Sequence, residues 1–383
     1  MTITPIISAL SAVIEDPALW TSHLPAALAG AAPRLVEKGG AFAWLVDGRT
    51  AAPSARLRQA LDALPTGQGG AALDNIGWLS TAEGRTWLQE RDDVQGEVLY
   101  SVGGVWDLIN ASGDPAFVLA CYRAYNDWIA DLSSQDPGSF VGLARIPVTG
   151  VVDATAELIR AVETLKLRGA ILDAWPDGFE GPPAGPDADP FWEAAAALNA
   201  PVSIHQALNG AAEAPAPIHH GAAPSYAFDL NAIVYGNVFD RYPDLKIVSA
   251  NPTVGWAPTL FEGLSESYMR TSGVRRIQLA KDLLPNDYLR TFIWYVIQDD
   301  RFGVLNRDYF GDAHVMWGSF ALSAEDSVWP NTRRLFESHL AGMAPATRTA
   351  LASDVVSRLY GLGGAKPFTA EDAGRYARYA LIQ

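Results

Sequence analysis

The sequence predicts a single α/β domain folded as an eight-stranded (β/α)8 barrel, and three observations support this prediction. Short runs rich in β-branched and apolar residues alternate with longer helical segments along most of the chain. This alternation is typical of parallel strands joined by helical crossovers. Eight such runs can be distinguished, and a chain of 383 residues is long enough for one elaborated barrel. We therefore expect residues 1–383 to form one domain.

The expected elements follow one another as strand, helix, strand. The predicted strands cover residues 5–8, 98–102, 140–146, 169–172, 202–205, 246–249, 294–297 and 315–318. Helices are predicted at residues 115–132, 153–167 and 190–198. Asp114 and Asp189 each precede a proline. Both are predicted N-caps, because aspartate accepts hydrogen bonds from the free N–H groups of a first helical turn.

Three segments are expected to lie outside this regular alternation. Residues 36–88 are predicted to be an insertion after the first strand rather than a separate domain. Residues 176–189 are dense in Pro, Gly and Asp, and residues 207–224 are dense in Ala and Pro and contain His219 and His220. Each segment follows a predicted strand. In a (β/α)8 barrel the site lies at the C-terminal ends of the strands. We expect these two segments to be long loops over that face, either a lid or specificity wall or ordinary solvated loops.

The charge balance limits the possible partners. The net charge is -15, and no basic run occurs in the sequence. Nucleic acids and anionic membranes favour clustered Lys and Arg, so neither is an expected partner. The N-terminus lacks a positively charged segment before an apolar one, and no apolar run reaches the ~18 residues of a spanning helix. We expect a cytoplasmic protein that binds a small molecule.

The cysteine and aromatic content supports two further expectations. The single cysteine, Cys121, excludes an internal disulfide and is predicted to be a buried thiol without a catalytic role. The chain has 12 Trp, 13 Tyr and 14 Phe. Since this exceeds what one barrel core needs, we expect aromatic rings to line a pocket or a subunit interface. A homodimer, or a hetero-oligomer with a related subunit, is the expected assembly.

Six short stretches carry a family resemblance. They are Asp-Pro-Ala-Leu-Trp at 16–20, Tyr-Arg-Ala-Tyr-Asn-Asp-Trp at 122–128, Asp-Pro-Phe-Trp at 189–192, Pro-Val-Ser-Ile-His at 201–205, Val-Phe-Asp-Arg-Tyr-Pro-Asp-Leu-Lys at 238–246 and Trp-Gly-Ser at 317–319. In this order they resemble the amidohydrolase-related family, in the branch of aminocarboxymuconate semialdehyde decarboxylase and the dihydroxybenzoate decarboxylases. The resemblance runs from Ile6 to about Leu362 and implies a distorted (β/α)8 barrel.

The resemblance also implies a zinc or manganese site, and here the sequence departs from the family. Active members carry an acidic residue or histidine and a second histidine after strand one, a histidine after strand five and an aspartate after strand eight. These positions fall on Leu10, Ala12, His205 and Phe320, so only His205 is retained. Where relatives place a histidine or glutamate after strand six, this chain has Asn251. Because a lone imidazole holds a divalent ion poorly, we predict no metal cofactor.

His205 then has three interpretations: a general acid or base, a relic held by hydrogen bonds, or a donor to substrate. We favour the first and predict a catalytic set of His205, Asn251 and Arg145. The predicted substrate contacts are Tyr100, Asp173, Gln206, Trp256, Trp317 and Phe320.

Two arginines could reach a substrate. Arg145 is expected to pair with a carboxylate, either a substrate or Asp173, and its role is structural if Asp173 neutralises it. Relatives use an arginine from the region of Arg49, but here an Asp-Gly turn with a solvated arginine is predicted. The other candidate metal ligands match no metal-binding spacing; they are His219, His220, Asp299, Asp300 and Glu325.

Three functional hypotheses follow. The first is a metal-independent enzyme acting on a small aromatic or cyclic apolar acid or carbonyl compound by lyase chemistry, such as decarboxylation or another carbon–carbon cleavage. The second is a non-catalytic subunit or ligand-binding pseudoenzyme that pairs with a metal-holding relative. The third is a metal-dependent hydrolase with non-standard ligands. The space under His205 separates the first two hypotheses. An enzyme should have an open, polar space there, whereas in a non-catalytic subunit Leu10, Phe320 and Leu322 should fill it.

Overall fold

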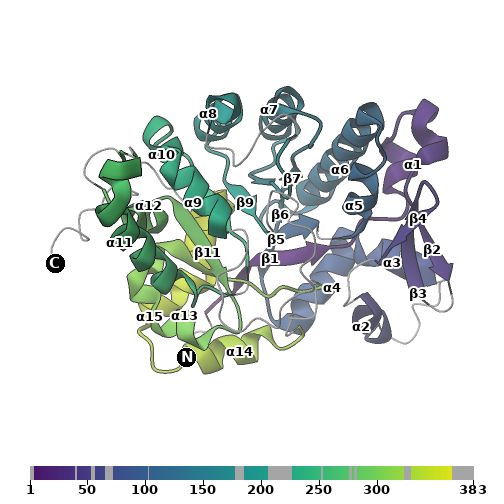
Figure 1. Cartoon of the computed structure of the whole chain (residues 1–383). Coiled ribbons are helices and arrows are strands. Elements are labelled where there is room, and N and C mark those ends of the chain that lie inside the picture. The colour runs from purple at the N-terminus through teal and green to yellow at the C-terminus, as the bar shows by residue number, and fades with distance from the viewer. Residues whose placement is uncertain are drawn as a thin grey trace.

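The computed structural model describes residues 4–38, 41–52, 57–64, 72–101, 103–176, 185–205, 227–251, 253–275, 278–279, 283–322 and 329–364. Parallel strands form its centre, with helices around them (Figure 1). The strands are β1 (Ile7–Val13), β5 (Gly96–Ser101), β6 (Phe140–Gly142), β7 (Ala144–Arg145), β8 (Ala170–Ile171), β9 (Val202–Ile204), β10 (Ile247–Ser249), β11 (Ile293–Ile297) and β12 (Val315–Trp317). They pair in the orders β1-β5-β6 and β12-β11-β10-β9-β8-β7.

These two sheets join into a closed barrel. Only Leu143 separates β6 from β7, so the two act as one kinked strand that continues from the first sheet into the second. At the other seam, Phe320 N–H donates to the Leu10 carbonyl and Ala12 N–H donates to the Ala321 carbonyl, both at 2.8 Å. Counting β6 and β7 as one strand gives the eight strands of a distorted (β/α)8 barrel. The predicted fold class is confirmed.

The first strand differs from its predicted bounds. It covers Ile7–Val13 instead of residues 5–8, and its register with β5 shifts between Ser8 and Ser11. A buried strand reads as a continuous apolar run, so its end cannot be located from alternation of apolar and polar residues. Leu10 and Ala12 therefore lie within β1 rather than after it.

Helix starts illustrate one correct and one wrong prediction. Asp114 caps α6 (Pro115–Gln135), with its Oδ1 accepting from Ala116 N at 3.0 Å and Phe117 N at 3.3 Å. The N-cap prediction for Asp189 is wrong, because it is the first residue of α8 (Asp189–Ala197) and caps no N–H group. The short 3-10 turn before α8 already places Ala188 in the helical region, so the helix begins one residue earlier.

The remaining helices around the barrel vary from one turn to five. They are α1 (Leu19–His23), α5 (Val105–Asn110), α7 (Val151–Ile159), α9 (Ala227–Tyr235), α10 (Val238–Arg241), α11 (Ala257–Arg275), α12 (Pro285–Thr291), α13 (Arg301–Leu305), α14 (Thr332–His339), α15 (Pro345–Thr349) and α16 (Val355–Tyr360). In the part of the chain that the structure describes, no helix is both long and apolar enough to span a bilayer.

The segment after β1 forms a small antiparallel sheet and three helices at one side of the barrel (Figure 1). These elements are β2 (Arg34–Lys38), β3 (Ala41–Val46), β4 (Arg49–Ala51), α2 (Leu57–Asp62), α3 (Ala72–Leu79) and α4 (Ala82–Asp92). Arg85 of α4 is fully buried; its Nε donates to Glu97 Oε1 of β5 and its Nη1 to the Ala12 carbonyl of β1, both at 2.8 Å. These bonds attach the segment to the barrel; that residues 1–383 form a single domain stays a prediction.

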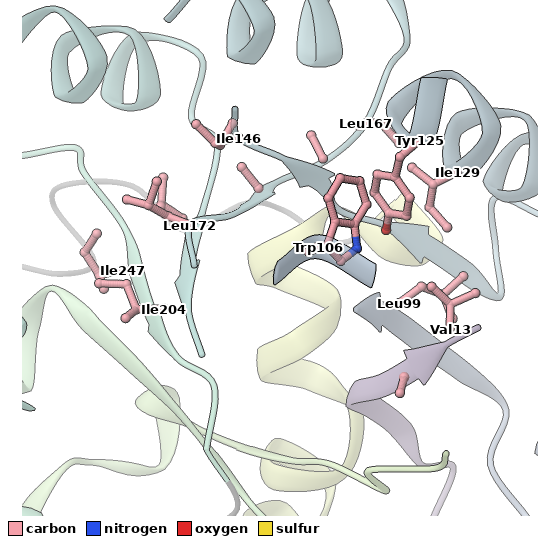
Figure 2. Packing of buried hydrophobic residues seen from close by; sticks show 14 of the residues in the cluster. Val13, Leu99, Trp106, Tyr125, Ile129, Ile146, Leu167, Leu172, Ile204 and Ile247 are labelled. Atoms are coloured by element: carbon pink, nitrogen blue, oxygen red, sulfur yellow. The ribbon is translucent and has the colours of Figure 1, made fainter. Parts of the chain in front are cut away.

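Apolar side chains pack in two layers. Leu10, Tyr100 and Phe320 belong to an inner cluster inside the barrel. Tyr360 of α16 joins this cluster and lies beside Gly169, directly before β8, so α16 covers the N-terminal end of the barrel. The outer cluster lies between strands and helices (Figure 2) and includes Trp106, whose ring centroid is 5.3 Å from that of Tyr125.

The one cysteine belongs to the outer cluster. Cys121 is fully buried on α6, as predicted. Burial raises the pKa of its thiol to about 12, so the reactive thiolate is disfavoured.

Candidate functional site

Four residues at the C-terminal ends of neighbouring strands form the candidate site. Ser101 ends β5, Arg145 ends β7, Asp173 follows β8 and His205 follows β9. Neighbouring strands are parallel and in register, so their C-terminal ends meet at one face of the barrel. The structure thus brings together three of the predicted site residues.

Arg145 is held within the protein. Its guanidinium is 4% exposed, pairs with the Asp173 carboxylate and donates from Nη1 to the Ser101 carbonyl at 2.5 Å. The face of the guanidinium lies 4.2 Å from the centroid of the Trp106 ring. Burial alone lowers the pKa of Arg145, but Asp173 together with Tyr122, Tyr125 and Glu15 outweighs that effect, so the pKa is raised. A structural role was predicted for Arg145 if Asp173 neutralises its charge. Since the two side chains form an ion pair, Arg145 has that structural role.

The sequence reasoning missed Glu15. This carboxylate is 1% exposed and lies two residues after β1. Its Oε1 accepts from the Ser101 hydroxyl, and from Trp106 Nε1 at 3.0 Å. Its negative charge acts on Arg145, so Glu15 belongs to the same buried charge cluster. The signal in the sequence was an acidic residue just after an apolar strand, at the end of the barrel where the site was expected.

His205 has the environment of a neutral imidazole. It is partly buried, and its ring centroid lies 6.3 Å from that of Tyr100. Burial lowers the pKa of His205 below its usual 6.5; Asp173 opposes this effect, and Arg145 adds to it. A neutral imidazole carries one nitrogen that can accept a proton, as a general base requires.

Tyr100 lies in the interior of the barrel, on the same side of the sheet as His205. Its ring is fully buried, and its hydroxyl is 2.8 Å from Ser203 Oγ, two residues before His205 on β9. Burial, with a contribution from Tyr360, raises the pKa of Tyr100 well above its usual value. Tyr100 is therefore a neutral phenol.

The positions at which the family resemblance implies metal ligands are filled by apolar side chains. Leu10, Ala12 and Phe320 are buried, and Leu322 is buried beside them in sequence. None of these side chains has a lone pair to donate, so the residues present do not fit a zinc or manganese ion. Within the described ranges, no group of three His, Cys, Asp or Glu side chains could hold a metal ion.

The backbone after β12 is strained where the family has its aspartate. Phe320 and Leu322 have φ of 53° and 60°, in the left-handed region that such side chains rarely adopt. Two serine hydroxyls of β1 support this turn through the hydroxyl of Ser319, which follows β12. Ser8 and Ser11 lie 3.2 and 3.1 Å from Ser319 Oγ and 3.0 Å from each other. Hydroxyls and apolar groups thus occupy the β1–β12 seam.

Other predicted contacts are engaged elsewhere. Asn251 Oδ1 accepts from Thr253 N and Oγ1, both at 3.3 Å, in a local turn. Trp256 donates from Nε1 to the Thr253 carbonyl at 2.9 Å. Trp317 is fully buried, with its ring 5.2 Å from that of Phe336 of α14, on the outer side of β12.

Further residues considered from the sequence have other roles or lie outside the described residues. Asp47 and Gly48 both have positive φ and form the predicted turn, and Arg49 is exposed. Asp300 accepts three backbone N–H groups at 2.6 to 2.8 Å, and Asp299 lies 3.1 Å from His339 Nε2. The residues outside the described ranges are Gln206, His219, His220 and Glu325.

Comparison with known sequences agrees with the resemblance. A sequence profile of the amidohydrolase family matches residues 108–362. The gamma-resorcylate decarboxylase of Polaromonas sp. strain JS666 is 31% identical over 140 residues, which cover 33% of this chain and 42% of that protein. The 2-amino-3-carboxymuconate-6-semialdehyde decarboxylase of Dictyostelium discoideum is 30% identical over 168 residues, 42% of this chain and 45% of that protein. The matches span less than half the length of either relative.

Solved structures share the fold at low sequence identity. An amidohydrolase from Mycobacterium avium subsp. paratuberculosis superposes with a TM-score of 0.70 at 15% identity, over 94% of this chain and 99% of that one. The 5-carboxyvanillate decarboxylase of Sphingomonas paucimobilis gives 0.64 at 18% identity, over 94% and 100%. A dihydroxybenzoic acid decarboxylase from Polaromonas sp. JS666, solved with bound manganese and 2-nitroresorcinol, gives 0.60 at 17%, over 94% and 97%.

Proposed function

The chain belongs to the amidohydrolase family, and from this premise we propose that it is a lyase acting on a small aromatic or cyclic carboxylic acid, with His205 transferring the proton. The two curated relatives are both named as decarboxylases of carboxylic acids, which supports this reaction class.

The observation that carries the proposal is the state of His205. It is the one family ligand that this chain retains, it lies at the end of β9, and its lowered pKa makes it neutral near pH 7. Asp173, fixed by its pair with Arg145, acts electrostatically on the imidazole. We propose that Arg145 positions Asp173 and that Asn251 contacts the substrate.

Decarboxylation needs only that a proton move and a carbon–carbon bond break. The neutral imidazole of His205 accepts the proton of the bound acid and delivers it to the ring carbon that bears the carboxyl group. A π electron pair of the ring forms the new carbon–hydrogen bond. The electrons of the breaking carbon–carbon bond restore the ring as CO2 leaves, so RCO2H becomes RH and CO2. The apolar surroundings of Leu10 and Phe320 disfavour the charged carboxylate relative to a transition state with dispersed charge.

We propose that this reaction proceeds without the divalent metal of the family. The support is the identity of the side chains at the ligand positions, since Leu10, Ala12 and Phe320 offer no donor atoms. The proposed setting is a cytoplasmic protein, a homodimer or a partner of a related subunit, in line with the net charge of -15 and the aromatic content.

The proposal is tested by measuring 13CO2 release from a panel of carboxyl-labelled hydroxybenzoic and cyclic acids. His205→Gln should lower the rate by about 100-fold or more, because general acid–base catalysis contributes that much. His23→Gln is the matched control, since His23 lies on α1 beside Asp131 and outside the site. A His205→Gln variant as active as the control would refute the role of His205.

A second function is favoured by one specific observation. Leu10, Phe320 and Leu322 are all buried, which is the filled arrangement expected of a non-catalytic subunit. In that case the chain would release no CO2 from any acid in the panel. It would instead change the turnover or the stability of a metal-holding relative when the two are mixed.

A further inference from the structure

A cavity lies at the opposite end of the barrel from the candidate site. It has a volume of about 180 Å3 and opens between the end of α6, the start of β6 and the loop before β8. Phe140, Leu165 and Leu167 supply apolar walls. A cavity of this size accommodates a six-membered ring, because engineered cavities of about 150 Å3 bind benzene.

Two cations line the same cavity. Lys166 is exposed, and its Nζ donates to the Glu163 carbonyl at 2.5 Å. Arg168 is half-buried and donates from Nη2 to the Pro137 carbonyl at 2.9 Å. Among the described residues, Arg168 Nη1 is buried and has no hydrogen-bond partner. Both side chains therefore bond to neutral carbonyls and not to carboxylates.

This arrangement leaves positive charge uncompensated in a chain with a net charge of -15. Burial lowers the pKa of Arg168, and no carboxylate among the described residues counteracts that effect. The contrast with Arg145, Arg85 and Arg160 is direct, since each of these pairs with an acidic side chain. A desolvated guanidinium without a counter-charge is costly unless an anion joins it.

The backbone at Lys166 adds a second, independent observation. Its φ is 62°, in the left-handed region, at the turn that follows the short π-helical segment Arg160–Thr164. Glycine and asparagine suit such a position best, whereas a lysine is strained there. A strained residue that also presents a cation to a cavity points to a binding role.

We propose that this cavity binds a small organic carboxylate, with the carboxylate between Lys166 and Arg168 and the apolar body against Phe140, Leu165 and Leu167. Lysine and arginine both form charge-assisted hydrogen bonds with carboxylate oxygens. The cavity is separate from the strand ends that hold His205, so the proposal does not depend on the proposed reaction.

The test is a methyl NMR titration of the full chain with benzoate, followed at the Leu165 and Leu167 methyl groups. Benzoate should shift both signals saturably at millimolar concentration, and benzamide, which has the same shape without the charge, should not. Arg168→Gln and Lys166→Gly should each weaken benzoate binding by about tenfold, the equivalent of one charge-assisted hydrogen bond.

The controls separate loss of the site from loss of folding. Lys166→Gly should raise the melting temperature, because glycine relieves the positive φ. Arg301→Gln, at an exposed arginine on α13, should bind benzoate as the parent does. Absence of saturable shifts at Leu165 and Leu167, or equal affinity in all variants, would overturn the proposal.

Discussion

The guanidinium of Arg145 is almost fully buried, so its partner determines what it can do. The sequence placed Arg145 and Asp173 at neighbouring strand ends, and the structure joins them in an ion pair. Glu15 adds a second negative charge to the cluster, and Trp106 contacts both Glu15 and Arg145. The arginine is thus fully occupied by protein groups, and we expect it to stabilise the site more than it binds substrate.

Removing the carboxylate of Asp173 should therefore destabilise the protein. Asp173→Asn removes the carboxylate that pairs directly with the buried Arg145 and leaves only the weaker effect of Glu15, which should lower the free energy of unfolding by roughly 3 kcal/mol. Asp308→Asn is the control, because Asp308 is 82% exposed in its pair with Arg307. That substitution should cost less than about 1 kcal/mol. Equal urea midpoints for the two variants would show that Arg145 does not depend on Asp173.

A second prediction concerns His314 and acid. Burial lowers the pKa of His314 from 6.5 to about 4, and its ring stacks on Trp294 at 4.7 Å between centroids. Because the unfolded chain binds this proton more readily, stability is lost as the pH falls from about 6.5 towards 4. The loss amounts to roughly 3 kcal/mol for this one group. His314→Gln should flatten the dependence of the unfolding free energy on pH in this window, and parallel profiles would contradict the assignment.

At the scale of elements, helix caps distinguish two aspartates that look alike in sequence. Asp114 and Asp189 each precede a proline, but only Asp114 accepts hydrogen bonds from N–H groups of the following helix. Asp189 instead pairs with Arg241 at 2.8 Å, in a partly exposed position. The difference arises from the 3-10 turn before α8, which a local sequence pattern does not reveal.

This difference is measurable. Asp114→Ala should lower the free energy of unfolding by about 1 kcal/mol, the usual cost of losing an N-cap. Asp189→Ala should cost less than that, because a partly exposed ion pair contributes little and should lose its effect in high salt. Thermal unfolding at low and high salt separates the two. A larger loss for Asp189→Ala, insensitive to salt, would mean that it does cap α8.

The approximate positions of the strands could be predicted from the sequence, but several of their first and last residues could not. All eight strands were located from apolar runs, because strands buried on both faces carry little else. The end of β1 was missed, since the irregular register between Ser8 and Ser11 lets the strand continue to Val13. This error matters for the site, as it placed Leu10 and Ala12 outside a strand that in fact contains them.

At the scale of the whole molecule, closure of the barrel explains which parts of the site the sequence revealed. Strand ends that are distant in sequence meet at one face, so His205, Arg145 and Asp173 could be grouped from topology alone. Two features depend on contacts that a sequence pattern does not contain. One is the capture of Arg145 by Asp173, and the other is the buried Glu15 beneath Ser101 and Trp106.

Closure of the barrel also places β12 beside β1, and side chains fill the space between these two strands. Phe320 bonds to Leu10 through the backbone, and both side chains enter the inner cluster. At the positions where the family resemblance implies metal ligands, this chain has closely packed apolar side chains. The central claim of the proposed function is therefore that an apolar interior with one working histidine replaces the metal site of the family.

The most direct measurement is the metal content of the parent and of His205→Ala, by mass spectrometry on protein purified without chelator or histidine tag. We expect zinc and manganese far below one equivalent in the parent and no change in the variant. Near-stoichiometric zinc or manganese in the parent, lost in His205→Ala, would contradict it and would show that residues outside those considered complete a metal site.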